Sequence, residues 1–343
     1  MLRFVVPELG GPSTGGTVYN RELLRALAGR GAAFDTLDLV RAERALAAGE
    51  PGAYWIDTLF LAEFPRLRGL AGGGQRLGLI AHYLPALVRY GAAVTRAELS
   101  PDETFALDHA DAFVAPSGFM RAALERLGAR SGSVTVAEPG RLAPGVAPFP
   151  EPSAALRAVV VAHLVAGKGV DRLLAAFATH VEPADALTLE IAGSLTQDAA
   201  YAEGCRVFAT APALRERVTL LGELTPDAVN ERLRACDVLL SASSMESFGM
   251  ALAEARTLGV PIVARAGGNV ENLVSPASGG ELVGDASGVA LACLALCRNP
   301  AELTRRRERA RAGSLPARSW NRTADEFLPQ PVYANCEKGP MDK

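Results

Sequence analysis

Short apolar runs alternate with longer amphipathic stretches along the whole chain. Residues 2–6 are apolar except for Arg3 and predict a buried first strand. Residues 17–30 carry apolar side chains at helical spacing and predict the first helix. Further apolar runs predict strands at residues 34–40, 53–59, 77–81 and 112–115. Because predicted strands and helices alternate along the chain, we expect an α/β fold with a parallel sheet covered by helices on both faces.

A second series of the same kind follows a proline-rich stretch. Prolines 144, 148, 150 and 152 predict a semi-rigid linker. The predicted strands beyond it are residues 158–162, 187–191, 218–221, 238–241 and 261–264. With 343 residues and 49% hydrophobic content, the chain can form two cores. We expect domains at 1–147 and 153–318, followed by a C-terminal helix and tail at 319–343.

Two acids stand out around the predicted strand at 238–241. Glu246 lies in the loop after this strand, and Glu254 lies on the predicted helix at 250–258. Open α/β sheets bind ligands at the carboxyl ends of their strands, and a helix N-terminus favours phosphate. Two carboxylates that bind hydroxyls beside a phosphate site suit a nucleotide sugar. The alternative is that Glu246 only satisfies a helix dipole and Glu254 is a solvated acid.

The sequence around these two acids resembles a known signature. The residues that carry the resemblance are Glu246, Ser247, Phe248, Gly249, Met250 and Glu254. This segment is similar to the E-x7-E signature of retaining glycosyltransferases of the GT-B fold, in the GT4-like group, as are residues 259–263 and 267–274. This resemblance implies two Rossmann-like doubly wound domains facing each other across a crevice, with the last helix returning to the first domain. It also implies that Glu254 holds the ribose hydroxyls and that Glu246 holds those of the donor sugar.

A lysine follows the first predicted strand of the second series. Lys168 lies between glycines ahead of a predicted helix and is a plausible phosphate ligand, although an exposed loop lysine would look the same. The segment resembles the KG-x-D-x-L segment of these enzymes, which implies that Lys168 binds the diphosphate. His163 stands where the family usually has Arg. A histidine is shorter and can be neutral, so this clamp is expected to be weaker or dependent on pH.

The first series offers three more candidates. Gly15 and Gly16 precede the first predicted helix, where glycines permit a tight turn and let backbone N–H groups approach a phosphate. They resemble the Gly-Gly of the family's first loop. His82 ends the predicted strand at 77–81 and resembles the histidine that lines the sugar site in many relatives. A structural role for His82 is the alternative.

Charge and missing motifs narrow the possible functions. The net charge of −3 gives no bulk attraction to nucleic acid. The absence of a Walker loop and of Gly-x-Gly-x-x-Gly after the first strand weighs against NTP hydrolysis and dinucleotide oxidoreduction. No Asp-x-Asp is present, so we expect no metal, and we expect no cofactor. Five scattered cysteines and the lack of a leading signal predict a cytoplasmic protein. The run at 305–311 predicts a solvated helical face, with a peripheral membrane patch as the alternative.

Together these features predict a metal-independent retaining glycosyltransferase. It would move a sugar from a nucleotide-diphosphate sugar to an acceptor that the sequence does not identify. Two alternatives stay open: a catalytically degenerate protein that only binds a nucleotide sugar, and a sugar phosphorylase on the same fold.

Overall fold

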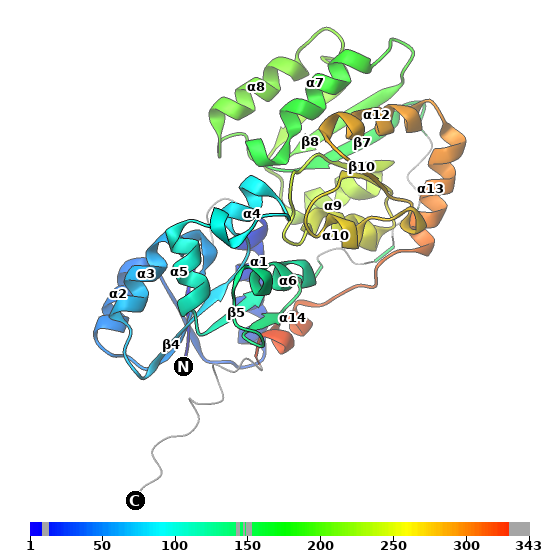
Figure 1. The fold of residues 1–343 in the computed structure, drawn as a ribbon. Helices are drawn as coiled ribbons and strands as arrows, with labels where there is room; N and C mark the ends of the chain where they lie inside the picture. Colours follow the sequence, from blue (N-terminus) through cyan, green and yellow to red (C-terminus); the bar gives the residue numbers. More distant parts are fainter. Residues whose placement is uncertain (9–13, 142–144, 147, 149–152, 329–343) are drawn as a thin grey trace, which may run out of the picture. The chain divides into compact units, whose positions relative to one another are not determined.

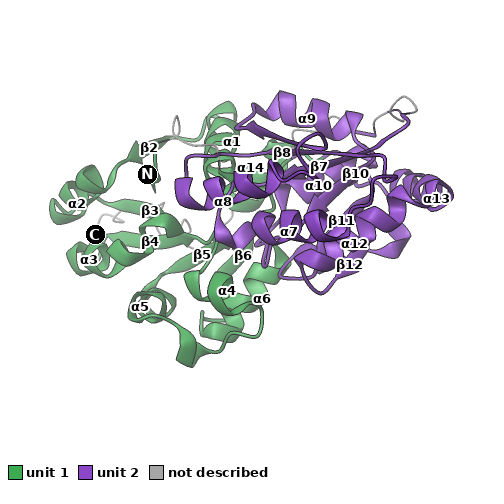
Figure 2. Ribbon diagram, turned by 90° about the horizontal axis from the view of Figure 1, so that it is seen from above, with its two compact units in different colours: residues 1–140, 318–343 green, residues 141–317 purple. Residues whose placement is uncertain are grey.

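The computed structural model describes residues 1–8, 14–141, 145–146, 148 and 153–328. The chain divides into two compact units, unit 1 with residues 1–140 and 318–343 and unit 2 with residues 141–317 (Figure 2). Most of the predicted proline-rich linker, part of the glycine-rich first loop and the tail lie outside the described residues.

Unit 1 is built on a six-stranded parallel sheet in the order β2-β1-β3-β4-β5-β6. Figure 1 labels two of these strands, β4 and β5. Its strands are β1 (Leu2–Val5), β2 (Phe34–Leu37), β3 (Gly52–Asp57), β4 (Gln75–Ile80), β5 (Ala112–Ala115) and β6 (Val134–Val136). Its helices are α1 (Gly15–Gly29), α2 (Leu39–Ala47), α3 (Phe64–Leu70), α4 (Pro85–Tyr90), α5 (Pro101–His109), α6 (Gly118–Leu127) and α14 (Trp320–Phe327).

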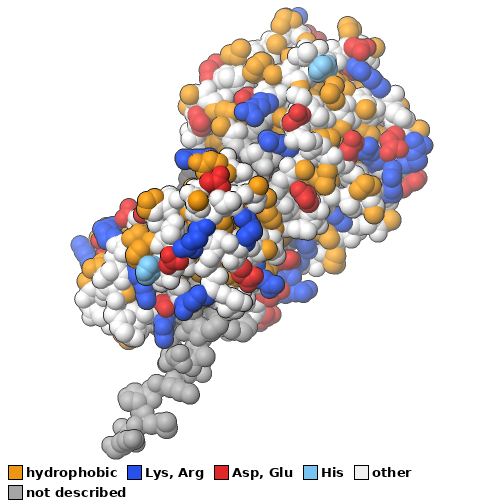
Figure 3. Space-filling model, in the orientation of Figure 1, with side chains coloured by type: hydrophobic (Ala, Val, Ile, Leu, Met, Phe, Trp, Pro, Cys, Tyr) orange, Lys and Arg blue, Asp and Glu red, His pale blue; other side chains and the backbone are white. Residues whose placement is uncertain are grey.

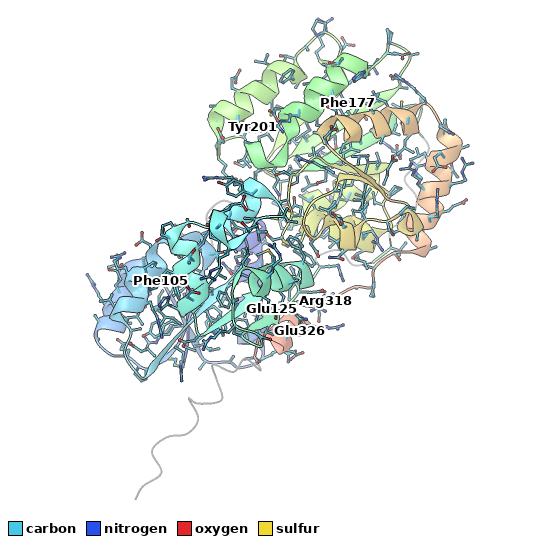
Figure 4. The ribbon with its side chains drawn as sticks, viewed as in Figure 1. Phe105, Glu125, Phe177, Tyr201, Arg318 and Glu326 are labelled. Carbon is cyan, nitrogen blue, oxygen red and sulfur yellow. The ribbon has the colours of Figure 1, made fainter. Side chains whose placement is uncertain are left out.

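The last helix packs into the core of unit 1. The Ser319 side chain caps α14 by accepting the backbone N–H of Arg322. The ring of Phe327 is fully buried and lies 5.5 Å from that of Phe4, measured between ring centroids. Arg318 and Glu326 form an ion pair beside this helix (Figure 4). Helix α14 therefore completes unit 1, although it follows all of unit 2 in the chain.

Unit 2 repeats the design with the strand order β12-β11-β10-β7-β8-β9, all parallel. The strands are β7 (Leu156–Val161), β8 (Leu187–Ala192), β9 (Val218–Gly222), β10 (Val238–Ser241), β11 (Ile262–Arg265) and β12 (Glu281–Val283). The helices are α7 (Val170–His180), α8 (Ala199–Ala209), α9 (Pro226–Ala235), α10 (Met250–Leu258), α11 (Val270–Leu273), α12 (Ala286–Cys297) and α13 (Pro300–Ala312).

Alternating side chains of the central strands of unit 2 fill two cores. Val159 and Leu239 belong to the core that contains α10, whereas Val160 and Leu240 belong to the core that contains α7 and α12. A strand that is buried on both faces needs a continuous apolar run, which is the pattern that the sequence shows. The predicted α/β class with two doubly wound domains is confirmed.

Four details differ from the prediction. The strand predicted at 53–59 ends at Asp57, because the Asp57 side chain accepts the N–H of Leu59 and starts a 3-10 helix there. The strand predicted at 34–40 stops at Leu37, because the Asp38 side chain accepts the N–H of Arg41 and starts α2 there. Strands β6 and β12 were not predicted. Each has three residues and lies at an edge of its sheet, so neither carries a long apolar run.

The arginine-rich run forms part of α13. Glu302, in the first turn, makes ion pairs with Arg305, Arg306 and Arg309. Acidic and basic side chains accordingly lie together over this helix in Figure 3. Among the described residues, no helix is long and apolar enough to cross a membrane.

Candidate functional site

Two loops of unit 2 are fixed against each other at the carboxyl edge of its sheet. One precedes α7, and the other follows β10. Ser244 donates its backbone N–H to the carbonyl of Gly167, 3.0 Å away. Gly169 has a φ of +64°, and a Cβ there would lie 2.6 Å from the carbonyl oxygen of Ala242. The close approach of these loops thus depends on a glycine beside Lys168.

Lys168 and Glu246, which are 78 positions apart in the chain, meet at this edge. The Nζ of Lys168 lies 2.6 Å from the Oε1 of Glu246, and the two side chains are 30% and 19% exposed. Lys168 is the one lysine among the residues that the structure describes, in a chain with 35 basic side chains. A partly exposed ammonium group can donate to a carboxylate and still offer N–H groups to a ligand.

The loop after β11 holds the backbone of Glu246. Asn269 donates its backbone N–H to the carbonyl of Glu246 at 2.8 Å, and its side-chain amide donates to the carbonyl of Phe248 at 2.7 Å. Gly268 has a φ of +69°, and a Cβ there would lie 2.4 Å from the carbonyl oxygen of Glu246. Three consecutive strand ends, β7, β10 and β11, therefore supply the loops around Lys168 and Glu246.

Helix α10 begins at Met250, four residues after Glu246. Its N-cap, Gly249, has a φ of +87° and no side chain to bond the N–H groups of the first turn. Glu254 lies in the second turn of the helix and is 8% exposed. Ser247 and Met250 are half-buried, while Phe248 is buried in the core beside α10. The helix end can therefore bind an anion.

The ring of His163 is hydrogen-bonded through Nδ1. The backbone N–H of Ser194 donates to this nitrogen over 2.9 Å. A protonated imidazole has no lone pair on either nitrogen, so this bond corresponds to a neutral ring with its proton on Nε2. Of the two states that the sequence left open, the structure favours the neutral one.

Arg265, which the sequence analysis did not single out, ends β11 close to this site. Gly267, two residues further on, accepts the backbone N–H of Glu246. Alternation along β11 places the Arg265 side chain on the face of Val263, which belongs to the core that contains α7 and α12. Its Nε is buried without a hydrogen-bond partner, and Arg265 forms no ion pair with any described residue. The positive charge of Arg265 is therefore not neutralised by a described carboxylate.

Unit 1 has a separate polar cluster around His82. A Cβ at Gly16 would lie 3.2 Å from Cδ2 of the His82 ring, so the start of α1 touches this histidine. Nε2 of His82 lies 2.9 Å from Oδ1 of Asn20 and 3.4 Å from Oδ2 of Asp57. Burial lowers the pKa of His82, and the Asp57 carboxylate partly offsets this effect. Gly15, the first residue of α1, is exposed.

The structure brings only some of the predicted site residues into contact. In unit 2, Lys168 contacts Glu246, and residues 247–249 link Glu246 to α10. Glu254 lies one turn into that helix, and His163 is bonded to Ser194. In unit 1, Gly16 lies against His82. Asp57 and Asn20 were missed. Asp57 follows a buried apolar run just as His82 does, and this signal could have found it. Among the described residues, no three His, Cys, Asp or Glu side chains are grouped to hold a metal ion.

Comparison with protein families gives a match over unit 2. Residues 148–312 match the family described as Glycosyl transferases group 1. A D-inositol 3-phosphate glycosyltransferase of Thermomonospora curvata is 32% identical over 171 residues, which are 47% of this chain and 39% of that protein. One from Salinispora tropica is 35% identical over 123 residues, 35% of this chain and 25% of that protein. The chain spans less than half the length of these relatives.

Solved structures match nearly the whole chain. The sucrose-phosphate synthase of Thermosynechococcus elongatus has a TM-score of 0.74 at 21% identity, covering 95% of this chain and 96% of that one. The Anabaena protein HepE, solved with UDP and glucose, has a TM-score of 0.72 at 16% identity, covering 95% and 97%. At such identities the likeness establishes the fold, which is GT-B.

Proposed function

We propose that this GT-B chain, whose residues 148–312 form a group 1 glycosyltransferase domain, transfers a sugar from a nucleotide-diphosphate sugar to an acceptor. The observation that carries the proposal is the contact between Lys168 and Glu246 beside the uncapped start of α10. It puts a cation, a carboxylate and a helix N-terminus at one sheet edge. A diphosphate needs the cation and the helix end, and a sugar needs the carboxylate.

In this proposal each group in unit 2 has one task. Lys168 and the N-terminus of α10 bind the diphosphate, and Arg265 adds a second positive charge. Glu254, from its nearly buried position, accepts hydrogen bonds from the ribose hydroxyls, and Glu246 accepts them from the donor sugar. His163 contributes a neutral Nε2–H. Ser247, Phe248, Gly249 and Met250 form the turn that holds these groups in place.

The reaction we propose is metal-independent and retains the anomeric configuration. The acceptor hydroxyl forms a bond to the anomeric carbon while the bond from that carbon to the diphosphate breaks, and the departing phosphate oxygen takes the acceptor's proton. Negative charge grows on the diphosphate in the transition state. Lys168, Arg265 and α10 stabilise that charge electrostatically, which is the task a metal ion performs in other transferases.

A thermal-shift panel of nucleotide sugars tests the proposal. UDP-glucose is the first probe, because the neighbour HepE was solved in complex with it; GDP-, ADP- and dTDP-sugars complete the panel. At 100 times its dissociation constant, the true donor stabilises the fold by about 2.7 kcal/mol. We expect donors with one of these nucleotide bases to stabilise the chain by this amount, and we expect the stabilisation to be the same in the presence of EDTA. If neither a nucleotide sugar nor a nucleoside diphosphate stabilises the chain, the proposal is wrong.

One observation supports a second candidate function. Because His163 replaces the usual Arg and is neutral, the diphosphate site has fewer fixed cations than the family signature implies. A protein that binds the donor without turning it over would fit this loss. Release of nucleoside diphosphate from the stabilising donor separates the two functions, since only the transferase produces it. A phosphorylase would require inorganic phosphate for the same release.

A further inference from the structure

The polar side chains around His82 in unit 1 are almost completely buried, which is unfavourable for polar and charged groups unless they form hydrogen bonds. Asp57 ends β3 and is 0% exposed, and His82 follows the neighbouring strand β4 and has a side chain that is 10% exposed. Asn20 reaches them from α1 and is 1% exposed. Polar groups buried this far must satisfy one another, so their hydrogen bonds determine which proton each group carries.

The bonds of Asp57 fix the orientation of the Asn20 amide. Oδ1 of Asp57 accepts the backbone N–H of Leu59 at 2.8 Å, and Oδ2 accepts the Asn20 amide at 2.5 Å. If this amide were flipped, two acceptor oxygens would face each other at that distance. The NH2 group of Asn20 therefore points to Asp57, and its oxygen points to His82.

The Asn20 oxygen in turn fixes the tautomer of His82. This oxygen only accepts hydrogen bonds and lies 2.9 Å from Nε2 of His82, and the Asp57 carboxylate lies 3.4 Å from the same nitrogen. Nε2 must therefore carry the proton. The ring is neutral, since burial disfavours its charged form, and Nδ1 keeps a bare lone pair.

We propose that Asp57 and Asn20 are positioning residues that hold His82 as the Nε2–H tautomer, so that its Nδ1 accepts a hydrogen bond from a sugar hydroxyl of the substrate. This inference rests on the proposed function for its substrate. The opposite tautomer would present an N–H donor at the same place. A buried carboxylate that fixes a histidine in this way sets both the orientation of the ring and the kind of hydrogen bond it offers.

Nitrogen NMR of the histidine rings tests the tautomer without any activity assay. The chain has four histidines, so the His82 signals are assigned by elimination with His109→Gln, His163→Gln and His180→Gln. We expect a protonated Nε2 and an unprotonated Nδ1 in the unmodified protein at neutral pH. A protonated Nδ1 would overturn the proposal, and this measurement does not require any variant of the cluster to fold.

The variant Asp57→Asn should reverse the tautomer through Asn20. An amide at position 57 still accepts the N–H of Leu59 with its oxygen, so its NH2 group faces Asn20. Asn20 must then flip and offer its own NH2 group to Nε2 of His82, which moves the ring proton to Nδ1. Asp111→Asn is the matched control, because Asp111 is a half-buried acid of the same sheet that pairs with Arg68 and Arg76 instead.

The activity of these variants separates a positioning role from a structural one. With UDP-glucose, or whichever nucleotide sugar stabilises the chain, we expect Asp57→Asn to lower kcat/KM at least tenfold and to leave UDP affinity unchanged. Asp111→Asn should keep both the tautomer and kcat/KM. If Asp57→Asn reverses the tautomer without loss of kcat/KM, the positioning role is refuted. If no donor binds at all, the proposed function fails while the tautomer result stands.

Discussion

Replacing Lys168 with Met tests the diphosphate site most selectively. The change removes one positive charge and keeps an unbranched side chain of similar length. Lys168 is the one lysine among the described residues, so no other lysine that the structure describes can take its place. The nearest charge it affects is Glu246, 2.6 Å away.

The structure predicts very different effects on stability and on binding. Both side chains of the Lys168–Glu246 pair are partly exposed, so the pair contributes at most about 1 kcal/mol to the free energy of unfolding. A charged hydrogen bond to a diphosphate contributes about 1.5–3 kcal/mol. Lys168→Met should therefore weaken nucleoside diphosphate binding roughly 10- to 150-fold, with little change in Tm.

Titration calorimetry with UDP and with uridine measures the contribution of the diphosphate to affinity. If the thermal-shift panel selects another base, the nucleoside diphosphate and nucleoside of that base are used instead. Lys168→Arg should recover part of the diphosphate affinity because it keeps the charge. Arg215→Met, which removes an exposed cation elsewhere in unit 2, should have no effect. If Lys168→Met weakens uridine as much as UDP, or leaves UDP affinity unchanged, Lys168 does not bind the diphosphate.

Three further predictions follow from the same contacts. Glu254→Gln should weaken nucleoside diphosphate binding by about 1.5–3 kcal/mol, and unchanged affinity by calorimetry would remove Glu254 from the ribose site. His163→Arg should lower the free energy of unfolding by about 1–3 kcal/mol in urea, because the buried N–H of Ser194 loses its acceptor; a fully stable variant would contradict that bond. The lowered pKa of His82 means that its stabilising effect is complete above its unfolded pKa, near 6.5, and is lost as pH falls from there through the folded value. Between about pH 7 and 5, the free energy of unfolding should therefore fall by up to about 1.4 kcal/mol per pH unit more in the unmodified protein than in His82→Gln. An equal slope in both proteins would refute this prediction.

Much of the fold could be predicted because the strands are buried on both faces. Residues 238–241 and 250–258 were predicted as strand and helix with the bounds that the structure has, since an apolar run, two glycines and a helical stripe define them. Three-residue edge strands carry too few apolar positions to be recognised. The strand predicted at 34–40 ran too long because Val40 is β-branched and apolar, whereas the cap formed by Asp38 decides where α2 begins.

The sequence could place each candidate site residue in its own loop or helix, but it could not show which of these residues meet. Glu246 and Lys168 each stand in a loop after an apolar run, but their contact depends on β10 and β7 being neighbours in the sheet. The cluster around His82 was harder to predict, because Asn20 lies on a helix whose orientation against the sheet cannot be derived from the local sequence pattern. The neutral state of His163 depends on a backbone N–H of another strand end, which the sequence does not reveal.

The most direct test of the central claim is the stereochemistry of donor breakdown. Proton NMR follows the donor that stabilises the chain, with EDTA present and no acceptor, in the unmodified protein and in Glu246→Gln. We predict slow release of the nucleoside diphosphate, with the sugar appearing first in the anomeric configuration of the donor, and much slower release in Glu246→Gln. A donor that binds but is never cleaved, or a sugar that first appears in the opposite configuration, would contradict a metal-independent retaining glycosyltransferase.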